Sequence, residues 1–380
     1  MSFSHYLNRW DWDDQYLQSA SVSDTQVLAA IDKAKRQHPL DLGDFKTLIS
    51  PQATRHVREL AQLSHQLTVQ RFGRTMQLYI PLYLSNQCSN ICLYCGFSME
   101  NEIRRMTLTR EQLEAELDAI AQMGFEHILL VTGEAKRRVG MDYFRWALPL
   151  IKQRFANVSI EVQPLDEDEY HELVALGLDG MLCYQETYHK ARYQQVHLRG
   201  NKCHFEYRLD TADRAASAGV DKIGLGALIG LDDWRTDLFF VAAHLDYLRR
   251  RYWRSQFSIS FPRLRPCTGG LAPKSQMSDK ELVQAIAVFR LFHPDLELSI
   301  STREAPLFRE QLMPLGITAM SAFSSTQPGG YSKATDTALE QFAINDGRRP
   351  EEVEAAIRRI GYQPVWKNWD QSLSAMGLVR

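Results

Sequence analysis

The sequence predicts an α/β protein built as a (β/α)8 TIM-type barrel, with helical extensions at both ends. Eight short apolar runs, rich in β-branched residues, recur along the 380-residue chain and have the length of strands buried on both faces. Amphipathic segments of helical periodicity separate them. Eight such repeats within about 250 residues match the size of this barrel. A doubly wound open sheet fits the same alternation and is the alternative architecture.

The predicted strands also indicate where a site would lie. In barrels and in open parallel sheets alike, ligands bind at the carboxyl ends of the strands. Polar residues at the ends of the apolar runs are therefore the candidates for chemistry. The eight runs are residues 78–84, 127–134, 158–165, 180–187, 222–231, 257–264, 297–304 and 317–324.

Two of the intervening helices carry clear start signals. Thr109 followed by Gln112 has the pattern of a capping box, and Gly124 ends the same helix. Ser278 followed by Glu281 begins a second helix, which stops before a proline. Both helices follow the strand-helix alternation, so their signals support the barrel.

The segments outside the barrel read mainly as helices. Helices are predicted near residues 23–36 and 55–71, and Pro350 opens another close to the C-terminus. The predicted domains are an N-terminal helical extension (1–76), a barrel (77–325) and a C-terminal tail that packs on the barrel (326–380).

The overall charge and composition exclude several classes of protein. With 44 Lys and Arg against 46 Asp and Glu, no global field attracts nucleic acid or an anionic membrane. Residues 1–15 lack a secretory pattern, and no apolar run approaches the ~20 residues of a membrane helix. We expect a cytoplasmic protein that binds neither nucleic acid nor membrane. In that compartment the six cysteines serve as metal ligands, redox groups or packing rather than disulfides.

Three cysteines follow the first predicted strand in a segment of loop composition. Cys88, Cys92 and Cys95 have metal-ligand spacing, and thiolates suit zinc or an iron-sulfur cluster. Structural zinc usually takes a fourth protein ligand, whereas three thiolates on a four-iron cluster leave one iron open. Zinc with a distant fourth ligand and simple packing remain alternatives. The other cysteines are isolated and are expected to pack as small apolar side chains: Cys183, Cys203 and Cys267.

The cysteine motif, with Tyr94 before its last member, resembles that of the radical S-adenosylmethionine (SAM) superfamily. More narrowly, nearly the whole chain is similar to the 2-iminoacetate synthase family, the tyrosine lyases of thiamine thiazole biosynthesis. The motifs that carry this resemblance are residues 131–134 (VTGE), 160–164 (IEVQP), 301–304 (STRE), 324–331 (SSTQPGGY) and 361–370 (GYQPVWKNWD).

This resemblance implies a cofactor set and a reaction. The three cysteines would hold a 4Fe-4S cluster, and SAM would bind the open iron through its amino and carboxylate groups. A deoxyadenosyl radical would take a hydrogen atom from the amino group of L-tyrosine, and Cα–Cβ cleavage would give 2-iminoacetate (dehydroglycine) and p-cresol. SAM would end as 5′-deoxyadenosine and methionine. The implied partners are thiazole synthase, in a complex, and flavodoxin or ferredoxin as electron donor.

The resemblance also assigns cofactor contacts at strand ends. Gly133 and Glu134 match the motif that receives the methionyl ammonium of SAM, and Glu186 matches an acid that binds the ribose. Arg208 matches an arginine that pairs with the SAM carboxylate, for which a guanidinium fork is suited. Tyr94 belongs to the same cofactor-binding set.

Glu161 and Gln163 are further candidates for SAM contact. They alternate with Val162 on the third predicted strand, so both should face one side. Two polar groups facing a barrel interior are costly unless they bind something. SAM contact is therefore favoured over an internal polar network.

Arg303 and Ser321 are the predicted substrate anchors. Arg303 ends the seventh predicted strand and Ser321 lies within the eighth. The matching positions in aromatic amino-acid lyases of the superfamily hold the substrate carboxylate. The alternative for Arg303 is an ordinary strand-end ion pair with Glu304.

Of three other functions, the first is set aside because the ligands of its second cluster are missing, and the other two stay as alternatives. The tyrosine lyase of hydrogenase maturation carries a second cysteine cluster near its C-terminus, whereas no cysteine follows Cys267 in this chain. A tryptophan lyase stays open because the ring pocket cannot be read from the sequence. A non-enzymatic iron-sulfur or zinc module is an alternative of another class, against which the incomplete ligand set argues.

Overall fold

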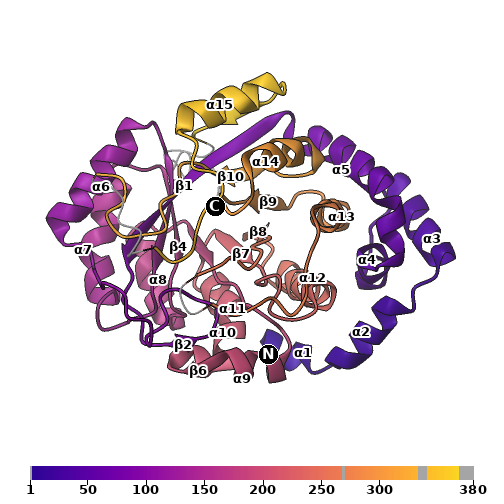
Figure 1. The fold of residues 1–380 in the computed structure, drawn as a ribbon, viewed down its shortest axis with the longest axis horizontal. Coiled ribbons are helices and arrows are strands. Elements are labelled where there is room, and N and C mark those ends of the chain that lie inside the picture. The colour runs from indigo at the N-terminus through magenta and orange to yellow at the C-terminus, as the bar shows by residue number, and fades with distance from the viewer. Residues whose placement is uncertain (1, 268–269, 333–339, 368–380) are drawn as a thin grey trace.

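Eight parallel strands close into a barrel, as predicted (Figure 1). The computed structural model of the chain describes residues 2–267, 270–332 and 340–367. The last barrel strand pairs with the first through Gln77 and Ala319, which excludes the open sheet. The barrel strands are β1 (Thr75–Ser85), β3 (His127–Thr132), β4 (Asn157–Glu161), β5 (Gly180–Leu182), β7 (Lys222–Leu225), β8 (Gln256–Ser260), β9 (Glu297–Ile300) and β10 (Ala319–Ser321).

Every barrel strand falls on a predicted apolar run, but seven of the eight end earlier than the run does. The run 222–231 is the clearest case, because β7 ends at Leu225 and the remaining apolar residues form a buried loop. Apolar residues continue beyond the hydrogen-bonded part of these strands because the loops that follow the strands are themselves buried over the carboxyl end of the barrel. The strand ends are also where the site residues begin.

Helices surround the barrel and pack their apolar faces on it. Thr109 and Ser278 each form the predicted capping box, and Gly124 follows its helix with a φ of +85°. The helices between barrel strands are α6 (Arg110–Gln122), α7 (Met141–Lys152), α8 (Glu167–Ala175), α9 (Lys190–Val196), α10 (Phe205–Leu209), α11 (Thr211–Ser217), α12 (Trp234–Arg251), α13 (Asp279–Phe292) and α14 (Pro306–Leu312).

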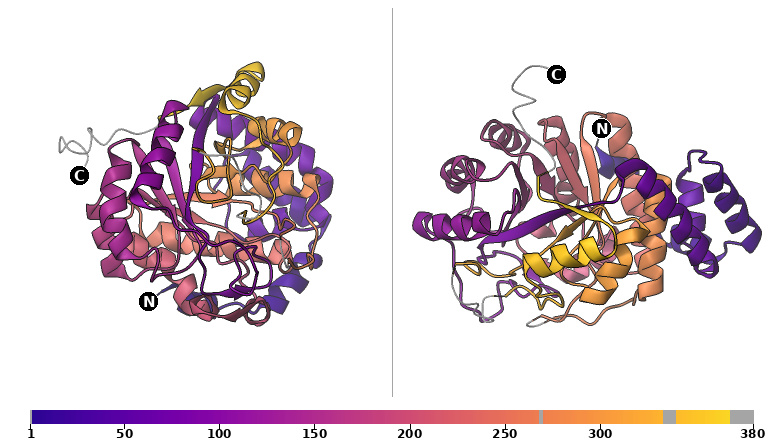
Figure 2. Two further views of the ribbon diagram at one scale, coloured as in Figure 1. Left: turned by 60° about the vertical axis from the view of Figure 1, so that its left-hand side comes forward. Right: turned by 90° about the horizontal axis from the view of Figure 1, so that it is seen from above.

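The N-terminal helices lie along one side of the barrel, against α12 and α13 (Figure 2). They are α1 (Phe3–Leu7), α2 (Trp12–Ala20), α3 (Asp24–Lys35), α4 (Leu42–Ile49) and α5 (Val57–Phe72). The start of the chain is anchored by Phe3. Its ring stacks on His244 with 4.0 Å between centroids, and its N–H donates to Asp213 over 3.1 Å. Burial of Phe3 thus ties this extension to the barrel.

The C-terminal part adds one helix and one strand that pack on the barrel. Helix α15 (Pro350–Arg359) begins at the predicted proline. Strand β11 (Gln363–Val365), which the sequence did not indicate, extends the sheet by pairing with the first residues of β1. Residues 333–339 and 368–380 of the predicted tail lie outside the described residues. No helix within the described ranges combines the length and apolar character needed to cross a bilayer.

Candidate active site

A cavity at the carboxyl ends of the barrel strands brings together residues from seven of the eight strands and their loops. It contains all but one of the predicted site residues. Those that line it are Cys88, Cys92, Tyr94, Cys95, Gly133, Glu134, Glu161, Glu186, Arg208, Arg303 and Ser321. Gln163 is the exception. The strand-end location predicted for the site therefore matches the cavity.

The three cysteines lie on one wall of this cavity, in the loop that follows β1. Within the loop, β2 (Ile91–Cys92) pairs antiparallel with β6 (His197–Arg199), and Met99 N–H donates to Asn90 O over 2.8 Å. These bonds brace the cysteine loop internally and connect it to the segment that contains β6. Among the residues that line the cavity, no fourth cysteine and no histidine accompanies the three thiols.

The thiol set fits an iron-sulfur cluster better than a zinc ion. Nowhere in the described part of the chain do three or more Cys, His, Asp or Glu side chains converge as ligands of a single ion. A structural zinc would need four such ligands, whereas cysteines bind a cluster through separate irons. Cys88, Cys92 and Cys95 would therefore hold an iron-sulfur cluster and leave one of its irons without a protein ligand.

Gly133 lets the end of β3 approach the cysteine loop closely. A Cβ atom at this position would lie 2.3 Å from the carbonyl oxygen of Gln87, so only glycine fits. Glu134 follows directly, and its carbonyl oxygen accepts hydrogen bonds from Ser89 N–H (3.0 Å) and Ser89 Oγ (2.8 Å). The Gly-Glu pair is therefore fixed to the loop that carries the cysteines.

Four charged side chains form a connected group beside the cysteines, here called the charged cluster: Glu134, Glu186, Lys202 and Arg208. Arg208 Nη1 donates to Glu134 Oε1 over 2.8 Å, and Lys202 Nζ donates to Glu186 Oε1 over 2.7 Å. Arg208 Nη2 also reaches Glu186 at 3.5 Å. Two cations and two carboxylates thus balance one another in a buried space.

The charged cluster keeps its carboxylates ionised. Burial alone would raise the pKa of both, but the nearby Arg208 and Lys202 charges outweigh it and lower the pKa of Glu134 and Glu186. Glu186 also adopts a φ of +71°, which is rare for a residue other than glycine and is typical of functional sites.

Lys202 is the site residue that the sequence analysis missed. It lies in a short 3-10 turn, η2 (Asn201–Cys203), with no motif around it, and its N–H donates to Asn90 Oδ1 of the cysteine loop over 3.0 Å. The amine also lies 5.6 Å from the ring centroid of Tyr94. Only the folded chain brings a lysine of this turn to carboxylates on two strand ends.

Tyr94 is buried beside the cysteines, and its hydroxyl is 2.7 Å from His197 Nε2.

Gln163 does not line the cavity. Strand β4 ends at Glu161, so the alternation that would place Gln163 on the same face stops there. Its amide donates to Val139 O over 2.8 Å, and its own oxygen has no hydrogen-bond partner in the described structure.

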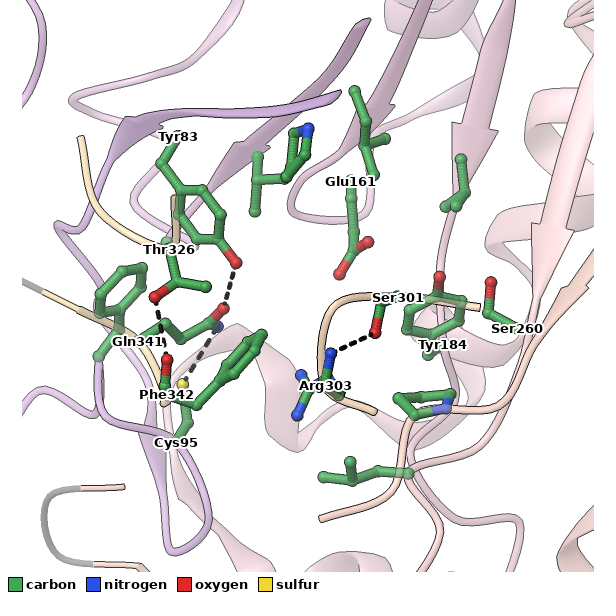
Figure 3. A pocket seen from close by; sticks show the side chains of 18 of the residues that line it. Tyr83, Cys95, Glu161, Tyr184, Ser260, Ser301, Arg303, Thr326, Gln341 and Phe342 are labelled. Atoms are coloured by element: carbon green, nitrogen blue, oxygen red, sulfur yellow. Dashed lines mark hydrogen bonds between the residues drawn. The ribbon is translucent and has the colours of Figure 1, made fainter. Parts of the chain in front are cut away.

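Arg303 lies in the cavity (Figure 3). The predicted alternative, an ion pair with Glu304, is wrong, because Glu304 pairs with Arg263 instead. The guanidinium of Arg303 sits 3.5 Å from the ring centroid of Phe342, which fixes its orientation. Among the described residues no carboxylate forms an ion pair with it.

Ser321 ends β10 and has one free donor. Its hydroxyl oxygen accepts hydrogen bonds from Thr302 N–H (3.2 Å) and from Ser324 Oγ (3.1 Å). Because a hydroxyl has a single proton of its own, that proton remains available to donate to a group in the cavity.

Glu161 reaches the cavity from the end of β4. Three tyrosines line the same cavity, of which Tyr83 is buried and Tyr79 and Tyr184 are partly exposed. Its carboxylate accepts no hydrogen bond and forms no ion pair with any described residue. Burial, followed by repulsion from Glu186, raises the pKa of Glu161 to about 7. The pKa of Glu161 is thus shifted upward, whereas the pKa values of the two carboxylates in the charged cluster are shifted downward.

Two protein-family models match the chain. Residues 82–240 match the radical SAM superfamily, and residues 260–363 match the biotin and thiamin synthesis associated domain. The first match includes the cysteine loop and the charged cluster. The second includes Arg303 and Ser321.

Curated relatives match over nearly their full length. The chain is 52% identical over 373 residues to 2-iminoacetate synthase of Escherichia coli (strain K12), which covers 98% of each chain. It is 51% identical over 379 residues to the enzyme of the same name from Salmonella typhimurium (strain LT2), covering 99% of each. Among solved structures, the FeFe-hydrogenase maturase HydG from Carboxydothermus hydrogenoformans superposes with a TM-score of 0.87 at 30% identity, covering 94% of this chain and 84% of that one.

Proposed function

The chain belongs to the 2-iminoacetate synthase family of the radical SAM superfamily, and we propose from this premise how the cavity divides the work of the reaction. The enzyme is a carbon-carbon lyase. It cleaves the Cα–Cβ bond of L-tyrosine to 2-iminoacetate and p-cresol, with SAM converted to 5′-deoxyadenosine and methionine. One observation carries the assignment of roles: three cysteines, with no fourth ligand among the described residues, face a cavity that also holds unpaired charges.

The cofactor half of the cavity is the wall formed by the cysteine loop and the charged cluster. When bound, the 4Fe-4S cluster and SAM supply the radical that starts the reaction. Cys88, Cys92 and Cys95 would hold the cluster. Glu134 would bind the SAM ammonium, and Arg208 would bind its carboxylate. Because these two side chains already pair with each other, the site is organised before SAM enters.

Three more residues complete the proposed cofactor site. Glu186, held in its unusual backbone conformation, would bind the ribose hydroxyls. Lys202 would keep Glu186 ionised and therefore able to accept those hydrogen bonds. Tyr94 would pack against the cofactor from the cysteine loop.

The substrate half of the cavity is the wall formed by β9, β10 and their loops. Arg303 would bind the tyrosine carboxylate, since its guanidinium lacks a carboxylate partner among the described residues. The free proton of Ser321 would donate a second hydrogen bond to the same carboxylate. Two donors from neighbouring strands thus fix one end of the substrate.

Two partners follow from the chemistry of the reaction. An imine such as 2-iminoacetate hydrolyses readily in water, so a complex with thiazole synthase would protect it during transfer. A low-potential protein, flavodoxin or ferredoxin, would deliver the electron. The exposed Ser89 lies next to Cys88, which makes this part of the surface a short route to the cluster.

Anaerobic reconstitution tests the proposed function. The expected result is four irons and four sulfides per chain, and 5′-deoxyadenosine together with p-cresol when tyrosine is present. Cys88→Ala should abolish cluster assembly and the formation of both products, whereas Cys203→Ser, outside the cavity, should change none of them. An indole product from tryptophan in place of p-cresol would support the tryptophan lyase. Stoichiometric zinc without deoxyadenosine would support a non-enzymatic module.

A further inference from the structure

The charges that line the cavity do not all cancel. Of the charged side chains on its wall, the four of the charged cluster pair with one another. Glu161, Arg265 and Arg303 have no oppositely charged partner within the described ranges. Glu161 is thus the one carboxylate on this wall without a cation, whereas two arginines there lack an anion.

An unpaired carboxylate in such a place needs an explanation. Burying an ionised group without a partner is costly, and among the described residues no side chain forms a hydrogen bond or an ion pair with this carboxylate. Figure 3 shows the carboxylate of Glu161 and the guanidinium of Arg303 directed into the same open space. Glu161 and Arg303, an anion and a cation that face the same space without partners among the described residues, match a ligand that carries both charges, as an amino acid does.

We propose that Glu161 receives the α-ammonium group of the amino-acid substrate and accepts a proton from it, while Arg303 holds the α-carboxylate. The inference rests on the proposed function and deepens it. It replaces the sequence-based assignment of Glu161 to SAM, since the charged cluster already provides carboxylates for the ammonium and the ribose of SAM.

The step is a simple proton transfer. One N–H bond of the ammonium breaks, its electron pair stays on nitrogen, and the proton forms an O–H bond with Glu161. The products are a neutral amine and a neutral carboxylic acid, and no electron leaves either group. Removal of a hydrogen atom from the neutral amine then leaves a neutral rather than a cationic nitrogen radical.

The groups around Glu161 suit a base of this kind. Burial and, after it, the charge of Glu186 oppose the ionisation of Glu161, while three nearby cations favour it: Arg303, Lys202 and Arg208. The result is a carboxylate whose pKa, about 7, lies near the working pH, where a base is most effective.

The nearby phenols do not compete for the proton. Burial raises the pKa of Tyr79 to about 12 and raises the pKa of Tyr83 and Tyr184 well above its ordinary value. All three therefore stay neutral and can act only as hydrogen-bond partners.

Glu161→Gln tests the assignment because it keeps the size of the side chain and removes the base. Tyrosine and SAM binding to the reconstituted enzyme are measured separately, by anaerobic equilibrium dialysis. We expect tyrosine affinity to fall at least tenfold and SAM affinity to stay within twofold. The rate of p-cresol formation should fall on the order of a hundredfold, the usual contribution of a general base. Below pH 7 the wild-type rate should fall as Glu161 becomes protonated, and this limb should be absent in the variant.

Two further variants complete the experiment. Glu172→Gln makes the same chemical change in a surface ion pair with Arg145 and should leave both affinities unchanged. Glu161→Asp retains a base and should restore part of the p-cresol rate together with the acid limb, which also tests the idea if the glutamine variant does not fold.

The inference is overturned if Glu161→Gln weakens SAM rather than tyrosine, or if it affects neither ligand. If wild-type enzyme binds tyrosine but makes no p-cresol, the proposed function fails. The dialysis comparison would still decide whether Glu161 binds the ammonium.

Discussion

Arg208 donates a hydrogen bond to Glu134 over 2.8 Å, although the sequence predicts that the two residues bind different groups of SAM. Both side chains are largely buried, and without this contact Glu134 would keep only Lys202 (3.8 Å) and Arg208 only Glu186 (3.5 Å) as oppositely charged neighbours among the described residues. The pair therefore compensates two buried charges and shapes the cofactor site at the same time. Binding of SAM would exchange contacts within this pair for contacts to the cofactor.

Replacing Arg208 should destabilise the protein as well as weaken SAM binding. Arg208→Met leaves Glu134 with Lys202 at 3.8 Å as its only nearby cation in the described structure. Loss of one partner of a buried ion pair typically costs about 3–5 kcal/mol. Urea unfolding of the cluster-free protein measures this cost. In the double variant with Glu134→Gln the loss should be smaller than the sum of the two single losses, because the uncompensated charge is gone. Strict additivity would show that the two side chains do not interact.

Arg303→Gln should affect tyrosine and leave the cofactors in place. The guanidinium is the only part of the site proposed to pair with the substrate carboxylate through a charge. Loss of a charge-assisted hydrogen bond of about 1.5–3 kcal/mol corresponds to a KM for tyrosine raised roughly 10- to 150-fold. Steady-state kinetics at saturating SAM give this KM. Iron content and SAM affinity should match wild type, and an unchanged KM would rule out Arg303 as the anchor.

The sequence predicts the framework of the fold well because local rules govern it. Strands buried on both faces leave continuous apolar runs, and all eight barrel strands fall on such runs. The capping boxes that begin at Thr109 and Ser278 can be predicted because each involves two side chains only three residues apart. Strand β11 was missed because Gln363–Val365 is short and contains a proline, so only its pairing with β1 makes it a strand.

The sequence predicts most of the residues that form the site, but it does not predict which of their charged side chains form ion pairs. Motifs located Glu134, Glu186 and Arg208, yet whether a charge is paired depends on neighbours far away in the chain. Lys202 carries no motif, and its contacts arise from the fold of the loop after β5. Glu161 and Arg303 are informative for the opposite reason, because the fold supplies neither with a partner among the described residues. Sequence spacing alone does not distinguish a charged side chain that forms an ion pair from one that does not.

His244 should make the stability of the protein depend on pH. Burial against Phe3 lowers the pKa of His244 from 6.5 to about 3, so the folded state keeps this ring neutral. The unfolded chain binds the proton once the pH falls below about 6.5, which favours unfolding. The contribution of neutral His244 to the free energy of unfolding is therefore full above pH 6.5 and is lost as the pH falls toward the pKa of about 3 in the folded state. Between pH 8 and pH 5 this residue should cost about 2 kcal/mol of unfolding free energy.

Comparison with His244→Gln isolates that contribution from the other histidines. Glutamine can replace the hydrogen bond between His244 Nδ1 and the Tyr188 hydroxyl (3.0 Å) but does not titrate. Urea unfolding at pH 8 and at pH 5 should show a smaller decrease for the variant. Equal decreases in the two proteins would mean that His244 is protonated in the folded state.

Asp346 should connect the C-terminal segment to the substrate anchor. It forms an ion pair with Arg309, both side chains are fully buried, and Arg309 in turn donates to the carbonyl oxygen of Ser321. Asp346→Asn removes the charge that compensates Arg309, at an expected cost of about 3–5 kcal/mol. Because Arg309 holds β10 where Ser321 faces the cavity, the KM for tyrosine should rise as well. Glu354→Gln, in an exposed pair with Arg358, should cost less than about 0.5 kcal/mol. Equal unfolding midpoints for the two variants would show that the buried pair does not secure β10.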